Sequence, residues 1–332
     1  MNDPVMNLAD SDFKLFARLG IPKELLVLAG VVRVTDRAAR EDYGMTGVGD
    51  MSGVLFPYFD PRDGRRKTAR LRRDNPEIED GQSKRKYVSA YRDRRHLYFV
   101  PGCAELVSDP SVPVVLVEAE KSALALVAWA ERNQHKLLPV AMGGCSGWRG
   151  RIGKQDGADG EQVDETGPLP DLAICRNRDV VVMLDSNADA KFEVRAARFA
   201  LVRELGHMGA RVRIATVPEL ADVNGPDDLI AVRGDEAIRS VLELVQPAAE
   251  LAVAEVEAAI EEIVAAKPKI SAEHMRRALD AVADISDHIQ RRLMEARIAA
   301  AVRGVVPKGT VVREVSARRR EREGRPGRCH LR

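Results

Sequence analysis

Between residues 112 and 246, short and mainly apolar runs alternate with amphipathic segments. The candidate strands cover residues 114–117, 137–141, 180–184 and 212–217, and helical patterns cover residues 121–131 and 192–205. Runs of four to six residues without polar alternation are typical of strands buried on both faces, as in a parallel sheet. The pattern therefore predicts an α/β domain over residues 111–246, with a parallel sheet that carries helices on both faces.

The flanking regions have different patterns. Residues 1–110 predict a small α+β region with helices over residues 12–19 and 23–28 and a hairpin that turns at Asp63 and Gly64. Between residues 143 and 179 a stretch rich in Gly and Asp is too long for an ordinary connection, so we expect a lid or a disordered segment there.

The C-terminal region is rich in Ala, Glu and Arg. It predicts a helical extension over residues 247–323, with helices over residues 248–266, 271–303 and 311–323, and a disordered tail over residues 324–332. No apolar segment is long enough to cross a membrane and the start is not a signal peptide, so we expect a cytoplasmic protein.

Charge is balanced overall but not locally. The net charge of +1 excludes a globally basic, histone-like binder. Residues 62–95, however, hold 13 Lys or Arg against 6 Asp or Glu, with tyrosines interleaved. Such a patch predicts binding to a nucleic-acid backbone, and a solvated charged face is the alternative. The candidate residues are Arg65, Arg66, Lys67, Arg70, Arg72, Arg73, Lys84, Arg85 and Lys86.

Acidic residues follow two of the candidate strands. Glu118 comes after the first and Asp185 after the third. Ligands gather at the carboxyl ends of strands in open parallel sheets, so we expect these side chains at one edge, where Mg²⁺ would offset their charge. Asn187 and Asp189 follow Asp185 at alternate positions, so their side chains could converge with it on one metal ion. After the last candidate strand, Asp227 and Asp228 are further candidates for the acidic site. The structural alternative is that Asp185 or Asn187 caps the following helix, and Lys121 is expected to be an exposed helix lysine.

These segments resemble the TOPRIM domain shared by bacterial primases, topoisomerases and some nucleases. The resemblance covers residues 112–246 and rests on VEAEKSALAL, LDSNADAKFEVRAARFAL and NGPDDLI, with the small-residue turn of Gly143 and Gly144. In detail the segments are most similar to an uncharacterised primase-like TOPRIM branch in primase-helicase proteins of phages, plasmids and other mobile elements. The four cysteines lie too far apart to build the zinc-binding module of complete bacterial primases.

The resemblance implies a site and an activity. It makes Glu118 the general acid or base and a metal-site residue, Asp185 the principal ligand of Mg²⁺ or Mn²⁺, and Asn187, Asp189 and Asp227 further ligands. The sequence departs from the family at Asn187, which replaces an acid of the usual Asp-x-Asp pair, and at Gly225, which replaces the first acid of a primase-type Asp-Pro-Asp.

The implied function is Mg²⁺-dependent, primase-like phosphoryl transfer on DNA or RNA, single-stranded by expectation, in replication of a mobile element. The alternatives are a non-catalytic module that binds DNA or recruits a helicase, and a TOPRIM-type nuclease. The abrupt, Arg-rich C-terminus suggests the front part of a longer replication protein. Oligomeric state is left open.

Overall fold

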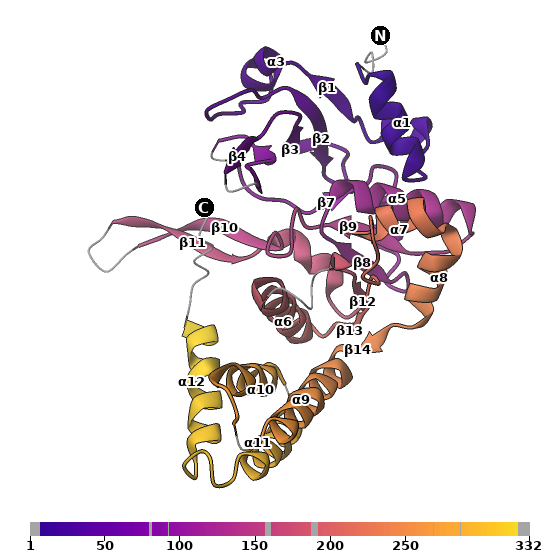
Figure 1. Cartoon of the computed structure of the whole chain (residues 1–332). Helices are drawn as coiled ribbons and strands as arrows, with labels where there is room; N and C mark the ends of the chain where they lie inside the picture. Colours follow the sequence, from indigo (N-terminus) through magenta and orange to yellow (C-terminus); the bar gives the residue numbers. More distant parts are fainter. Residues whose placement is uncertain are drawn as a thin grey trace. The chain divides into compact units, whose positions relative to one another are not determined.

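The computed structural model describes residues 7–79, 82–91, 93–156, 161–186, 192–267, 269–285 and 287–324. The chain forms two compact units, Met1–Val245 and Gln246–Arg332. The first unit is mixed α/β, and the second is mainly helical (Figure 1). The region boundary near residue 110 stays a prediction.

The first unit opens with short helices and an antiparallel sheet. The helices are α1 (Asp10–Arg18), α2 (Lys23–Leu28) and α3 (Asp36–Glu41). The sheet has the order β1-β2-β3-β6, made by β1 (Val32–Val34), β2 (Gly53–Phe59), β3 (Arg66–Arg73) and β6 (Tyr87–Ser89), and a separate hairpin joins β4 (Glu77–Glu79) to β5 (Gln82–Lys84). The predicted hairpin is confirmed, because β2 and β3 pair antiparallel across a turn in which Gly64 has a φ of 67°.

A parallel sheet follows in the same unit. Its strands are β8 (Val114–Val117), β9 (Leu138–Ala141), β12 (Asp179–Val182) and β13 (Arg211–Ile214), and β7 (Tyr98–Phe99) pairs antiparallel with β9. Within the unit the order is β13-β12-β8-β9-β7. The associated helices are α4 (Ala104–Ser108), α5 (Glu120–Arg132), α6 (Phe192–His207), α7 (Pro226–Arg233) and α8 (Asp235–Glu243). This arrangement confirms the predicted fold class.

The connections in this sheet run in opposite directions. From β8 through α5 the chain moves to β9 on one side, and from β12 through α6 it moves to β13 on the other side. Right-handed crossovers therefore place α5 and α6 on opposite faces of the sheet (Figure 1). The order reverses between β8 and β12, and the crevice beyond the carboxyl ends of these two strands is the place where open α/β sheets bind ligands.

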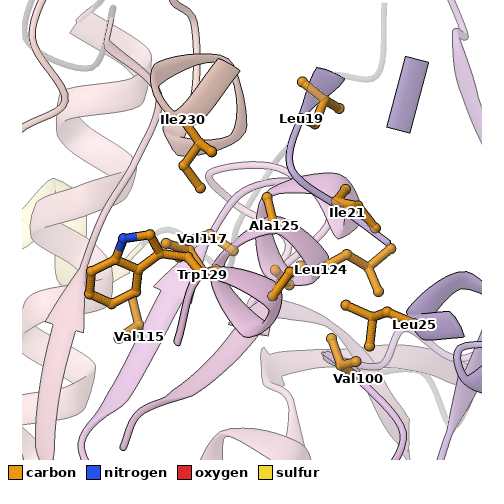
Figure 2. Packing of buried hydrophobic residues seen from close by; sticks show 14 of the residues in the cluster. Leu19, Ile21, Leu25, Val100, Val115, Val117, Leu124, Ala125, Trp129 and Ile230 are labelled. Carbon is orange, nitrogen blue, oxygen red and sulfur yellow. The ribbon is translucent and has the colours of Figure 1, made fainter. Parts of the chain in front are cut away.

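One buried apolar cluster joins the parallel sheet to the N-terminal helices. Val115 and Val117 of β8 lie beside Leu124 and Trp129 of α5 (Figure 2). The same cluster contains residues of the N-terminal segments and of α7, including Leu19, Ile21, Leu25 and Ile230. Because α5 packs against all of these elements, the start of α5 is held firmly at the sheet edge.

The stretch between β9 and β12 is largely an antiparallel hairpin, so the expectation of a disordered segment is wrong for residues 149–156 and 162–168. Strands β10 (Arg149–Asp156) and β11 (Gln162–Pro168) pair over most of their length, and a 3-10 helix (Pro170–Cys175) follows. The hairpin is closed at its base by buried Trp148, whose carbonyl accepts from the Leu169 N–H at 2.9 Å. The hairpin strands are polar and β11 is mostly exposed, so their sequence lacks the alternation of apolar and polar residues that predicts a strand.

The second unit begins with β14 (Gln246–Pro247) and contains α9 (Ala248–Ala265), α10 (Ala272–Asp284), α11 (His288–Ala301) and α12 (Thr310–Gly324). The single helix predicted over residues 271–303 is wrong, because the structure has two helices there. Asp287 caps the second by accepting from the Gln290 N–H at 2.7 Å, and Ile285 is extended. Residues 325–332, in the predicted tail, lie outside the described residues. No helix in the described part of the chain is long and apolar enough to span a membrane.

Candidate metal centre

Glu118 and Asp185 lie together at the carboxyl ends of the adjacent strands β8 and β12. The Asp185 N–H donates to Glu118 Oε1 at 3.2 Å. The Glu118 carbonyl accepts from the N–H groups of Gly143 and Gly144 at 2.8 and 2.9 Å, and both glycines have positive φ. The small-residue turn after β9 therefore holds the backbone of Glu118 in place and so positions its side chain at the sheet edge.

A third element, the segment that begins α7, reaches the same edge. Asn224 Nδ2 donates to Asp185 Oδ2 at 2.5 Å, and the Asn224 carbonyl accepts from the Ser186 N–H at 2.7 Å. Asp228, the third residue of α7, reaches back so that its Oδ2 accepts from the N–H groups of Asn224 at 3.2 Å and of Gly225, the N-cap residue, at 3.5 Å.

Asp227 is buried and held by the first turn of α5. Lys121 Nζ donates to its Oδ2 at 2.9 Å, and Ser122 Oγ donates to its Oδ1 at 2.6 Å. The expectation that Lys121 is an exposed helix lysine is wrong, because its side chain is 21% exposed and bonded to this carboxylate. Sequence reasoning missed Ser122 and Asn224, since neither residue type signals a charged site.

Gly225 leaves room for two carboxylates. A Cβ at this position would lie 2.9 Å from Asp227 Oδ1, 3.0 Å from Asp185 Oδ1 and 3.3 Å from Ser122 Oγ. Both carboxylates therefore approach the same point in space. An acidic side chain at position 225 would have no room here while Ser122 holds Asp227 in place.

We expect Gly225→Ala to destabilise the protein by about 1–3 kcal/mol, because the added methyl overlaps with carboxylates that are already bonded. Gly206→Ala is the matched control: a Cβ there meets nothing within 4 Å, and Gly206 lies in helix α6. This control should be stabilised by about 0.5–1 kcal/mol. Urea unfolding of both variants measures the difference, and equal effects of the two substitutions would show that the space at Gly225 is not restricted.

The accumulated negative charge changes the ionisation of Asp185. The pKa of Asp185 is raised to about 7, chiefly by burial and also by the carboxylates of Glu118, Asp227 and Asp228, while the hydrogen bond from Asn224 opposes the shift. Burial and like charges each disfavour the ionised form of a carboxylate, and a nearby cation would favour it.

The donors present fit a hard divalent cation. Mg²⁺ is bound in proteins through one or two carboxylates, with water and substrate phosphates as its other ligands, and Glu118 and Asp185 supply two such groups. Three side chains of His, Cys, Asp or Glu are nowhere close enough together to hold a metal within the described ranges. The predicted ligands Asn187 and Asp189 lie outside the described residues.

A second buried cluster, which the sequence did not reveal, lies two residues beyond Glu118. The Glu120 side chain is 1% exposed, and its Oε1 accepts from Tyr58 OH and, at 3.1 Å, from Arg70 Nη1. Its Oε2 is buried with no hydrogen-bond partner among the described residues. Arg70 also lies over the ring of Tyr87, 4.5 Å from its centroid. The ion pair ties strand β3 to the start of α5.

The predicted basic residues occupy different environments. Arg73 is 1% exposed and donates to both oxygens of Glu77, so a phosphate contact would require that ion pair to break. The pKa of Lys86 is lowered, mainly by desolvation and in addition by the positive charges of Arg72 and Lys121 nearby. Arg65, Arg66, Lys67, Arg85 and Lys86 are exposed, whereas Arg70, Arg72 and Lys84 are half-buried.

Comparisons with known proteins identify the fold. A family model described as a domain of unknown function, DUF3854, matches residues 104–237. No curated protein matches the chain by sequence. Among solved structures, the zinc-binding and RNA polymerase domains of the Aquifex aeolicus primase align with a TM-score of 0.52 and 16% identity, over 92% of this chain and 70% of that one.

Two further structures agree. The DnaG catalytic core has a TM-score of 0.52 and 17% identity, over 93% of this chain and 95% of that chain. The RNA polymerase domain of Mycobacterium tuberculosis primase DnaG, in complex with a double-stranded DNA oligomer with a 6-nucleotide overhang, has a TM-score of 0.51 and 17% identity, over 90% and 92% of the two chains. At these identities the likeness shows the fold alone: the chain has the fold of a primase catalytic core.

Proposed function

We propose that this chain is a primase-like protein that transfers nucleotidyl groups on a nucleic-acid template and depends on Mg²⁺ or Mn²⁺ held by Glu118 and Asp185. The observation that supports this most is the meeting of these two carboxylates at the switch point of the sheet, where burial and neighbouring acids raise the pKa of Asp185. Asp189 and Asn187 would extend the ligand set, with Asp227 nearby.

The residues divide the chemistry between them. A bound divalent cation would neutralise the negative charge of the phosphates during transfer. Glu118, fixed by the Asp185 N–H, would accept the proton of the attacking hydroxyl. Lys121, which pairs with Asp227, would bring positive charge to the mouth of the site. Phosphate groups entering there would also meet Lys86 and Arg72.

Nucleic acid is the proposed partner. The exposed basic residues around β3 and β5 suit a phosphate backbone, and one solved primase of the same fold is in complex with DNA that carries a single-stranded overhang. Replication of a mobile element, a helicase partner and a cytoplasmic location are further parts of this proposal.

Glu118→Gln is expected to lower metal-dependent primer synthesis on a single-stranded template by about 100-fold or more, because the amide cannot accept a proton. The assay follows labelled nucleotide incorporation with Mg²⁺ or Mn²⁺. Glu131→Gln, at the exposed far end of α5, is the matched control and should keep wild-type activity. Equal activity in Glu118→Gln and wild type would remove Glu118 from the mechanism, and cutting of plasmid DNA with Mn²⁺ would favour a nuclease.

A non-catalytic module is the second candidate function, because Gly225 replaces a family acid and Lys121 neutralises Asp227. Calorimetric titration with Mn²⁺ separates the two. Absence of binding to wild type, together with salt-sensitive DNA binding, would support the module that only binds DNA.

A further inference from the structure

A basic cleft lies between the β10–β11 hairpin and the loop that follows β6. It has a volume of about 870 Å³ and is lined by Tyr91, Arg94, Arg151, Gly153, Lys154 and Asp164. Three cationic side chains face a single carboxylate in this lining, so the cleft carries net positive charge. Arg94 belongs to the basic stretch of residues 62–95, but none of the three cations is among the candidate nucleic-acid-binding residues named from the sequence.

A β-bulge places two of these cations on one face of the hairpin. Arg151 pairs with Thr166 and Lys154 pairs with Asp164, with a register shift between Arg151 and Gly153. Thr166 and Asp164 are two residues apart on β11 and therefore face the same side, so their partners do too. In a regular strand, residues 151 and 154 would face opposite sides; the extra residue in the bulge brings both cations into the cleft.

The opposite wall is anchored to the body of the unit. The Tyr91 N–H donates to the Gly44 carbonyl at 3.3 Å, and Asp93 accepts from the Thr68 hydroxyl. Asp171 accepts from the Leu97 N–H at 2.9 Å and contacts His96 Nδ1 at the same distance. The loop is thus fixed before and after Arg94, and it presents a Tyr91 side chain that is 67% exposed.

We propose that this cleft binds the backbone of a single-stranded nucleic acid, with Arg94 and Lys154 on phosphates, Arg151 paired with Asp164 beside them, and a base stacked on the ring of Tyr91. This rests on the proposed nucleic-acid function and adds a second contact region along the hairpin. Spaced cations with an exposed aromatic ring are the combination that holds unpaired strands, because phosphates recur along the chain and every base has a stacking face. A duplex offers the ring no unpaired base.

The test is binding of a labelled oligonucleotide of about 20 nucleotides, followed by fluorescence anisotropy over a salt series in EDTA. In Arg94→Ala/Lys154→Ala, the loss of two phosphate contacts should lower the magnitude of the slope of log K against log salt by roughly 1.4 and weaken binding about 20-fold near 0.1 M salt. Arg37→Ala/Arg211→Ala removes the same charge from side chains that are 83% and 71% exposed and do not line the cleft, and it should leave the slope unchanged.

A second pair of variants tests stacking separately from charge. Tyr91→Ala should weaken binding by about 5-fold to 150-fold with an unchanged salt slope, whereas Tyr91→Phe should bind like wild type. Equal affinities and slopes for the cleft variants and the Arg37/Arg211 control would overturn the proposal. So would a cleft double variant that loses affinity for a free nucleoside triphosphate but keeps its affinity for the oligonucleotide.

The readout in EDTA keeps this inference separate from the proposed activity. Loss of oligonucleotide binding in the cleft variants supports the cleft even if the wild type makes no primers. If the wild type makes primers and the cleft variants bind the oligonucleotide as tightly as the wild type, the proposed activity stands and the proposed cleft site is rejected.

Discussion

Without divalent cations, Asp185→Asn is expected to be more stable than the wild type near pH 8 by on the order of 2 kcal/mol, allowing for solvent screening, or roughly 4–8 °C in melting temperature. The pKa of Asp185 in the folded protein, about 7, lies above its ordinary value of 3.8. The folded state therefore holds this proton more tightly than the unfolded state. The resulting stabilisation is complete below about pH 4 and is lost as the pH rises through about 7.

Thermal unfolding near pH 6, 7 and 8 in EDTA measures this effect. The wild type should lose stability over this range, and Asp185→Asn should lose much less, since its amide carbonyl can still accept from Asn224. Adding Mn²⁺ should raise the melting temperature of the wild type and leave the variant almost unchanged, because a ligand that binds the folded state stabilises it.

Asp50→Asn is the control for this experiment. Donation from Ser52 and Asn75 lowers the pKa of Asp50 to about 2, so its contribution to stability is complete above about pH 4 and constant between pH 6 and 8. This control should therefore show the same pH dependence as the wild type. If the stability of Asp185→Asn fell with pH as steeply as that of the wild type, the pKa of Asp185 would not be raised in the folded protein.

Arg70→Met is expected to destabilise the protein by about 3–5 kcal/mol, because it leaves the carboxylate of Glu120 buried without its cation. Glu120 is 1% exposed, and its remaining donor in the cluster is Tyr58 OH. Urea unfolding near pH 7.5 measures the loss.

The double variant Arg70→Met/Glu120→Gln should recover most of that stability, since the amide is neutral and its oxygen still accepts from Tyr58. Arg37→Met is the matched control: it breaks an exposed i,i+4 pair with Glu41 and should cost less than about 0.5 kcal/mol. If Arg70→Met cost no more than this control, the pair would not hold β3 to α5.

Several features of this chain follow from local patterns. The apolar runs that became β8 and β12 were predictable because burial on both faces demands apolar side chains at every position, a requirement that each segment meets alone. The turn at Gly64 was also predictable from local sequence, because its positive φ is a conformation that glycine adopts readily. The expectation that Glu118 and Asp185 share an edge needed one further rule, the gathering of ligands at strand ends.

Other features depended on partners far away in the chain. Arg70 appeared as one cation in a basic run, and only the packing of β3 against α5 shows that it neutralises Glu120, fifty residues later. Lys121 appeared exposed until the folded chain placed Asp227 beside it. The cleft cations Arg151 and Lys154 share a face because of a bulge, which leaves little trace in composition.

The sequence by itself determined the apolar strands and the helices of the parallel-sheet domain, and with them the class of fold, because periodic burial is a property of each segment; it did not show the polar β10–β11 hairpin or the break between α10 and α11. The tertiary structure alone decided which charges are neutralised and which remain to act. The physical reason is that the energy of a buried charge depends on the distance to its partners, and those distances exist only once strand order, register and helix packing are set.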